Sequence, residues 1–482
     1  MAAGSTKSYI TFAGVALCLL LCASSLHPQP PAPPPPLLIQ HVHLIEVDSG
    51  AVNDNTEVLV VAGRVAGIGS HLKHPKDAQV VDGSGKFLIP GLWDMHVHLA
   101  GLSADPKWSR DVLLPLLIAN GVIGVRDMGG SLPAVLEWRT QMAAGTLLGP
   151  QIYAAGPMLD GGFEDPNVLL TRNPKEALER VQQLKSMGAD FVKILSGFDR
   201  DTYFAIATDS RSAGLTFVGH VPPLIGTDEA ANAGQKSIEH ILYGGFALAC
   251  SSDPAAMRQQ MAAAMKSGAI LQIGKVQDAA ADAYDAAHAK ALWSTLVAKG
   301  TWVVPTLVST YTSAHLDELV NNNPAAAYLP RPVAAGWSAT ALKVSLRPEK
   351  IAFWKRELAR QIELTRQMHS AGVKILAGTD SLDPHNVPGR ALAQELTLLV
   401  QAGFTPLDAL RAATRNPAEF MARKDTGRVA EGARADLVLL DANPLADINN
   451  VTRIHAVVLG GKLLGREDLD GMLAKLKESA AQ

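Results

Sequence analysis

Short apolar runs alternate with helical stretches through the middle of the chain. The apolar runs are GLWDMHVHL, VIGVRDMG, QIYAAG, ADFVKIL, TFVGHV, KSIEHI, WVVPTLV and VKILAGTD. Between them lie segments with helical spacing, such as PKEALERVQQLKSMG. Strand–helix alternation indicates an α/β protein with a parallel sheet. Eight such units predict a closed (β/α)8 TIM barrel over residues 90–417.

A doubly wound open sheet is the alternative arrangement of these elements. That fold favours a glycine-rich phosphate-binding turn after its first strand, and the sequence has no such turn there. The stretch from about Tyr311 to His369 is too long for one crossover connection. We therefore expect it to add helices over the barrel.

Two β-rich segments flank this middle part. Between Leu37 and Leu88 the chain contains runs such as EVLVVAGRVAGIG, and GRVAEGARADLVLL and IHAVVLGGKLL lie near the other end. Alternating apolar positions, β-branched residues and glycine turns predict strands in both segments.

The first residues of the chain have a different composition. Lys7 precedes an apolar run from Ile10 to Leu21, and small residues follow at positions 23–25. This pattern predicts a secretory signal peptide over residues 1–25 and export to the periplasm or the medium. The run is shorter than the ~20 residues of a spanning helix, so we expect no stable membrane span after cleavage. An uncleaved N-terminal membrane anchor is the alternative.

Seven prolines lie between Pro28 and Pro36 and predict a semi-rigid linker over residues 26–36. Signal cleavage would remove Cys18 and Cys22 and leave Cys250 alone, so we expect no disulfide within the chain. The net charge is only −3, without a long basic run, and gives no indication of a nucleic-acid partner. The expected partner is a small-molecule substrate, and homo-oligomerisation is left open.

His96 and His98 occupy alternate positions of one apolar strand. Residues two apart on a strand point to the same face, so both imidazoles can reach one metal ion. A second H-x-H pair, His41 and His43, lies in the small β-rich segment. We interpret that pair as ordinary polar strand residues.

Three more candidate ligands end predicted strands: His220 in TFVGHV, His240 in KSIEH and Asp380 in ILAGTD. A lone histidine is more often a core residue and an aspartate more often a helix cap. Successive strand ends of a barrel favour metal ligands instead.

Lys193 interrupts the apolar run FVKIL, where an ammonium group is costly to bury. Desolvation favours a neutral amine, which can take up CO2 to form a carbamate that bridges two cations. A lysine that extends to the rim is the alternative.

Together these motifs resemble the amidohydrolase superfamily, in particular its imidazolonepropionase-like and prolidase-like branch. The matching stretches are PGLWDMHVHL, GVIGVRDMGG, GADFVKI, GHVP, KSIEHI, AGTDS, NVPGRALAQELTLLVQAGFTPLDALRAATRNPA and GARADLVLLDANPLADI. The resemblance implies that His96, His98 and Asp380 hold the more buried of two ions. It also implies that His220 and His240 hold the other ion.

The resemblance further implies that a carbamylated Lys193 bridges the two ions. It implies that residues 37–89 and 418–466 form one composite β-sandwich domain beside the barrel, and residues 467–482 are expected to be a helical tail. One position departs from many relatives, which carry tyrosine or histidine where this chain has Pro222. Substrate recognition therefore does not transfer directly from those relatives.

Nitrogen and carboxylate ligands predict two divalent ions, with zinc as the first choice. Two such ions ~3.5–4 Å apart can share a hydroxide that attacks a carbonyl. Asp380 would then move the proton to the leaving amine. The expected substrate is an amide such as an Xaa-Pro dipeptide or an N-acyl amino acid. A lactone, an ester or a cyclic amide is the alternative.

Two other functional classes are weaker. A mononuclear deaminase typically has a glutamate where this chain has Pro223, and it needs no bridging lysine. A non-catalytic binding protein would have lost a ligand, and every expected ligand is present.

Substrate-binding candidates lie near the ends of the predicted barrel strands: Arg126, Tyr243, Tyr311, His385 and Arg390. Arg126 or Arg390 could form a bidentate pair with a substrate carboxylate. A structural ion pair is the alternative for each arginine.

Overall fold

A computed structural model describes residues 1, 4, 33–101 and 105–481. The signal peptide expected over residues 1–25 and most of the linker lie outside the described residues, as do Cys18 and Cys22. Cys250 is buried and free. Among the helices of the described part, none combines the length and apolar character needed to cross a membrane.

Strands from both ends of the chain form one eight-stranded sheet. Its strands are β1 (Leu37–Ile45), β2 (Val52–Val61), β3 (Arg64–Gly69), β4 (Gln79–Asp82), β5 (Phe87–Pro90), β15 (Leu437–Leu440), β16 (Ile454–Leu459) and β17 (Lys462–Leu464). Their order is β17-β16-β15-β5-β1-β2-β3, with β4 paired to β1. β15 lies antiparallel to β5, which is the last strand before the middle part of the chain. The C-terminal strands therefore join the sheet through β5.

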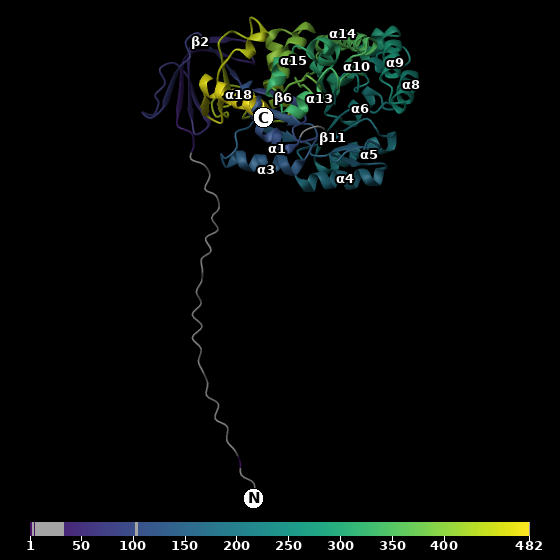
Figure 1. Ribbon diagram of the computed structural model, residues 1–482, viewed down its shortest axis with the longest axis horizontal. Coiled ribbons are helices and arrows are strands. Elements are labelled where there is room, and N and C mark those ends of the chain that lie inside the picture. Colours follow the sequence, from purple (N-terminus) through teal and green to yellow (C-terminus); the bar gives the residue numbers. More distant parts are fainter. Residues whose placement is uncertain (2–3, 5–32, 102–104, 482) are drawn as a thin grey trace.

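Alternating apolar residues of this sheet close a small core of their own, which includes Leu37, Val58, Leu88 and Leu437. Figure 1 shows these strands at one side of the molecule, with α8 (Pro254–Lys266) and α9 (Ile270–Asp282) at the opposite side.

The middle part contains two parallel sheets. The first has the order β6-β7-β8, from β6 (Leu92–Val97), β7 (Val122–Asp127) and β8 (Gln151–Ala154). The second has the order β10-β9-β11-β12-β13-β14, from β9 (Met158–Asp160), β10 (Val168–Leu170), β11 (Phe191–Ile194), β12 (Thr216–Gly219), β13 (Ser237–Glu239) and β14 (Trp302–Val304). The fold is therefore of the mixed α/β type.

Backbone hydrogen bonds link the two parallel sheets at both sides. The amide of Asp190, directly before β11, donates to the carbonyl of Ala154 in β8. On the other side Leu376 donates to Val303 in β14, and Met95 in β6 donates to Ala377. The segment at 374–377 is the eighth of the predicted strands. It lies between β14 and β6 without forming a regular strand. The amide of Ala377 donates to the carbonyl of Ala412, the last residue of α16 (Pro406–Ala412), and not to a neighbouring strand.

Helices connect these strands and cover them. They are α1 (Pro106–Trp108), α2 (Leu114–Ala119), α3 (Leu132–Ala143), α4 (Pro174–Met187), α5 (Arg200–Ala213), α6 (Thr227–Ala233), α7 (Phe246–Ala249), α8, α9, α10 (Ala286–Lys299), α11 (Leu307–Ala314), α12 (Leu316–Leu319), α13 (Arg331–Gly336), α14 (Pro348–Ser370), α15 (Arg390–Gln401), α16 (Pro406–Ala412), α17 (Arg415–Phe420) and α18 (Arg466–Ala481).

Local sequence signals explain where these helices begin and end. In α4, the side chain of Asn173 accepts a hydrogen bond from the amide of Glu176 and caps the first turn. The helix ends at Gly188, whose φ of 88° a residue with a side chain would rarely adopt. Capping at both ends sets the length of the crossover from β10 to β11.

The expected extra helices between Tyr311 and His369 are present as α12, α13 and α14, together with the end of α11. α14 packs against α11 and α9, so three helices that are separate in sequence form one layer. Figure 1 shows α14 and α9 near one another, away from the terminal strands. This layer contributes to the walls of the cavity described below.

Candidate metal centre

Each predicted ligand lies at or just beyond a parallel segment of the middle part. His96 is in β6, His98 follows it, and Lys193 is in β11. His220 follows β12 and His240 follows β13. The carboxyl ends of parallel strands meet at one edge of a sheet, and α/β proteins with parallel sheets bind small molecules at this edge. We call His96, His98, Lys193, His220, His240 and Asp380 the cluster.

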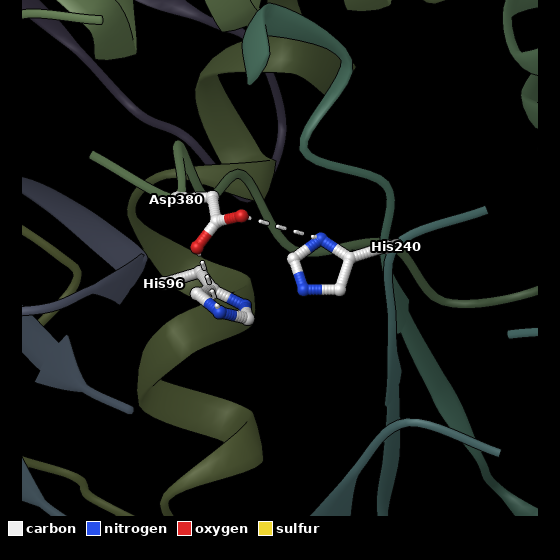
Figure 2. Close-up of side chains that lie close together, drawn as sticks. All are labelled: His96, His240 and Asp380. Atoms are coloured by element: carbon white, nitrogen blue, oxygen red, sulfur yellow. Dashed lines mark ion pairs between the residues drawn. The ribbon is translucent and has the colours of Figure 1, made fainter. Parts of the chain in front are cut away.

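The shortest separations in the cluster involve Asp380. One ligand atom each from His96, His240 and Asp380 lie within 4.8 Å of one another, and Figure 2 shows one carboxylate oxygen directed at each ring. Asp380 Oδ1 is 3.4 Å from Nε2 of His96 and 3.4 Å from Nε2 of His98. That spacing is long for a hydrogen bond. It matches the edge, about 3.4 Å, of a tetrahedron with metal–ligand bonds of ~2.1 Å.

The remaining members of the cluster lie beside these residues. The ring centroids of His220 and His240 are 5.0 Å apart. His98, Lys193 and His220 line a cavity of about 250 Å³ that His240 and Asp380 also line. The structure thus brings all six predicted ligands to one place.

The Nδ1 atom of every histidine in the cluster has a partner. Nδ1 of His96 lies 2.8 Å from the Glu239 carboxylate, and Nδ1 of His98 lies 3.2 Å from the Gly129 carbonyl. Nδ1 of His220 lies 2.9 Å from the Ser196 hydroxyl, and Nδ1 of His240 lies 2.7 Å from the Thr306 hydroxyl. A partner on Nδ1 fixes the ring and leaves Nε2 for a metal ion.

Two further features fit a metal ion. Nε2 of His96 is buried without a hydrogen-bond partner in the described residues, which is costly unless an ion occupies the site. Burial also favours the neutral form of three of the imidazoles, those of His96, His220 and His240, and metal binding requires neutral imidazole. It lowers the pKa of His240 to about 4 and lowers the pKa of His96 and of His220 well below the usual value.

Lys193 is almost fully buried, with 1% of its surface exposed. Burial lowers the pKa of its amine to about 8. A larger fraction of neutral amine is then available for reaction with CO2 than an exposed lysine offers.

His240, Asp380 and Thr306 have φ values of 60°, 56° and 49°. Non-glycine residues rarely adopt this left-handed conformation, and it persists only where the surrounding structure enforces it. Strained backbone at His240 and Asp380, and at Thr306, whose hydroxyl orients the ring of His240, is typical of a functional site.

The sequence did not identify Glu239 as part of the site. Its carboxylate is fully buried and contacts His96, Arg126 and the Ser237 hydroxyl. A signal was present, because an acidic residue in the apolar run KSIEHI is as unusual as Lys193 in FVKIL.

The prediction that Arg126 contacts substrate is contradicted by these bonds. Its guanidinium is fully buried, lies 2.8 Å from Glu239 and donates to the Met95 carbonyl over 2.7 Å. The arginine instead fixes the carboxylate that orients His96, which is the structural ion pair we considered as the alternative.

The remaining substrate-binding candidates divide into two groups. Tyr243 stacks on His220 with ring centroids 4.8 Å apart and lines the cluster cavity. Tyr311, His385 and Arg390 instead line a separate cavity of about 280 Å³, to which no cluster residue contributes among the described residues. The structure therefore does not bring these three residues to the cluster.

A second and larger cavity also reaches the cluster. It has a volume of about 400 Å³ and is lined by His240, Tyr243 and Asp380 together with residues of α11 and α14. The cluster thus lies where two cavities meet, with Tyr243 in both walls.

The H-x-H pair His41 and His43 has a different setting. Nδ1 of His41 is 2.8 Å from Asn55, and Nδ1 of His43 is 2.6 Å from Asp54. These are polar pairs between β1 and β2, as we interpreted them from the sequence.

The chain is similar to several known proteins. The model of the amidohydrolase family matches residues 87–464. Ochratoxinase of Aspergillus niger is 24% identical over 439 residues, which cover 78% of this chain and 75% of that protein. A dihydroorotase of Geotalea daltonii is 50% identical over 86 residues, but the match spans only 17% of this chain and 19% of that protein.

Among solved structures, a Xaa-Pro dipeptidase with bound methionine in its active site has the same fold. It is 20% identical, with a TM-score of 0.64 over 89% of this chain and 100% of that chain.

Proposed function

The chain belongs to the amidohydrolase family, and from this membership we propose that it is a binuclear metal-dependent hydrolase that cleaves a C–N amide bond. The observation that carries the proposal is the cluster itself, in which every Nδ1 is held by a partner and the Nε2 atoms of His96 and His98 face one carboxylate oxygen. We also infer that the parallel strands close into a (β/α)8 barrel beside a composite β-sandwich. The bonds of segment 374–377 to β14 and β6 support this closure.

The donor set suits two divalent ions, with zinc as the first choice. His96, His98 and Asp380 would hold one ion, and the rest of the cluster, with Lys193 as its carbamate, would complete the second site. When bound, such ions supply a water of lowered pKa and polarise the substrate carbonyl.

Asp380 is the residue we assign to proton transfer. Its side chain is 21% exposed, whereas that of His96 is fully buried, and it lines both cavities. It can therefore accept a proton from an attacking water and deliver it to the leaving nitrogen of a substrate that spans the two cavities. Tyr243, stacked on His220, lines both cavities and would contact a substrate that spans them.

The substrate that we propose is an Xaa-Pro dipeptide, an N-acyl amino acid or a related amide. Two similar proteins bear names of this kind, ochratoxinase and a Xaa-Pro dipeptidase, and these names describe those proteins. Esters, lactones and cyclic amides would use the same cluster and are the rival substrates.

Elemental analysis joined to a hydrolysis screen tests the proposal. Protein purified without chelator, then supplied with zinc and bicarbonate, should hold about two ions per chain. It should hydrolyse at least one N-acyl amino acid or Xaa-Pro dipeptide, and a chelator should abolish that activity. A ceiling of one ion would refute the binuclear site. Activity on esters or lactones alone would refute the amide assignment.

We propose in addition that the protein is exported, on the basis of the apolar run between Lys7 and the small residues at 23–25. The mass of the native protein decides this point. A mature chain that begins after about residue 24 supports export, whereas a chain that retains residues 1–21 in the membrane fraction supports an anchor.

A further inference from the structure

The 400 Å³ cavity extends from the cluster to the helical layer formed by α11 and α14. Its volume is within the range of small-molecule sites, ~300–1,000 Å³. Besides the cluster residues His240 and Asp380, its wall contains Lys350 and Trp354, one turn apart on α14. The cavity therefore joins the candidate metal centre to a cation and an indole ring.

Lys350 lies where the helix does not favour it. It belongs to the first turn of α14, which begins at Pro348, and the N-terminal end of a helix carries partial positive charge. A lysine there adds like charge to like charge, which the exposed Glu349 of the same turn offsets only in part. Both the lysine and the end of the helix favour an anionic group at this point.

Two other cations of α14 are paired, whereas Arg347, which precedes the helix, is exposed. Lys355 is 3.8 Å from Asp317, and Arg356 is 3.0 Å from Asp278. Within the described part of the chain, no carboxylate lies within ion-pair distance of Lys350. Lys350 is itself half-buried and lines the cavity without a counter-ion from the described residues.

The acidic groups of the same cavity are at the cluster. Asp380 belongs to the candidate metal centre, and Asp383 accepts a hydrogen bond of 2.7 Å from the Ser309 hydroxyl. The cavity thus has carboxylates beside the metal centre and an ammonium group on α14. This polarity orients a bound anion, because Asp383 repels it and Lys350 attracts it.

Apolar side chains also form part of the wall of this cavity. Trp354, Leu342 and Ile270 line it together with Lys350, so the anionic group of a ligand would be accompanied by an apolar body. The smaller cavity on the other side of the cluster is lined by Met158, Phe163 and other apolar residues.

From this arrangement we propose that Lys350 binds the carboxylate of the substrate, with Trp354 packed against the adjacent side chain. The substrate is an N-acyl amino acid with an apolar side chain, whose carboxylate end occupies the α14 cavity and whose apolar acyl group occupies the smaller cavity. The scissile amide then lies at the cluster, between the two. This inference rests on the proposed amide hydrolase function and names its specificity-determining residue.

A matched pair of substrates tests the proposal. N-benzoyl-leucine and N-benzoyl-leucinamide differ only in the carboxylate, and chromatography distinguishes release of leucine from release of leucinamide. The wild type should prefer the acid at least tenfold in kcat/KM. In Lys350→Met the acid-to-amide ratio should fall to about one, through a rise in KM for the acid. Lys350→Arg should keep the preference, and Lys343→Met, a change at an exposed lysine in the turn before α14, should not alter it.

Two outcomes overturn the inference while the proposed function stands: hydrolysis of both substrates at equal kcat/KM by the wild type, or an unchanged ratio in Lys350→Met. If the metal-loaded wild type cleaves neither substrate, the proposed function fails for this class, and the binding of N-benzoyl-leucine is measured by calorimetry. Binding at least tenfold weaker in Lys350→Met then upholds the carboxylate site, and equal binding overturns it.

Discussion

Glu239 Oε2 lies 2.8 Å from Nδ1 of His96, and both side chains are fully buried. The carboxylate is itself held, because Arg126 lies 2.8 Å away and the Ser237 hydroxyl donates to it. A carboxylate in this position keeps the proton on Nδ1 and leaves the lone pair of Nε2 directed at the cluster. Glu239 is thus a positioning residue, which acts on the metal centre through His96.

We expect Glu239→Gln to weaken zinc binding by roughly 10–100-fold, the effect typical of losing an outer-shell partner. Competition with a coloured chelator measures the zinc affinity of the folded variant. Glu357→Gln is the matched control, because Glu357 is also a buried glutamate bound to an arginine, Arg360, but belongs to α14. Equal zinc affinity in wild type and Glu239→Gln would show that the carboxylate does not position His96.

Lys193→Ala should reduce the metal content from about two ions per chain to one or none and abolish hydrolysis. The reason is that a buried amine of lowered pKa is the group that we expect to form the bridging carbamate. Elemental analysis measures the loss, and added acetate or propionate should restore part of the metal and of the activity. Lys107→Ala, at an exposed lysine outside the cluster, serves as the control. Retention of two ions by Lys193→Ala contradicts the bridge.

Thr306→Val should lower kcat/KM about tenfold, because a lost hydroxyl frees the ring of His240, whose Nδ1 lies 2.7 Å from it. One hydrogen bond worth about 1.4 kcal/mol corresponds to this factor. Valine keeps the shape and the β-branch of threonine, so the strained backbone is changed little. Thr306→Ser retains a hydroxyl and should retain most of the activity. Loss of activity in both variants would mean that packing, rather than the hydrogen bond, is responsible.

Glu395 gives a prediction about stability and pH. Burial raises the pKa of its carboxyl to about 8, although Oε2 accepts a hydrogen bond from the Val308 amide. In the unfolded chain the pKa is about 4.3, so between these values the folded state holds a proton that the unfolded state has lost. Folding stability should therefore fall as the pH rises through this window, by at most about 1.4 kcal/mol per pH unit.

Urea denaturation at pH 5, 7 and 9 measures this effect on the wild type and on Glu395→Gln. The glutamine cannot ionise, so the variant should lose less stability between pH 5 and pH 9 than the wild type. Parallel pH profiles for the two proteins would exclude Glu395 as the source of the dependence.

The order of the candidate ligands could be read from the sequence because each lies within or directly after a short apolar run. Seven of the eight predicted strands of the middle part form regular strands, from β6 to β14. The eighth, which precedes Asp380, joins its neighbours by only a few backbone bonds, since a helix end takes part of its hydrogen-bonding capacity. The periodicity of apolar residues indicates which segments are buried. It does not indicate which carbonyl each backbone amide bonds to.

The sequence by itself determined which residues form the cluster, because charged or metal-binding side chains in apolar runs are too costly to be accidental. Only the tertiary structure decided their environment. Glu239 reaches His96 from another strand and Arg126 reaches Glu239 from a third, while Lys350 reaches the cavity from a helix that the periodicity left unplaced. The physical reason is that a hydrogen bond or a cavity wall depends on distances across the fold. Local patterns encode which face of an element is buried, but not which distant side chain meets it there.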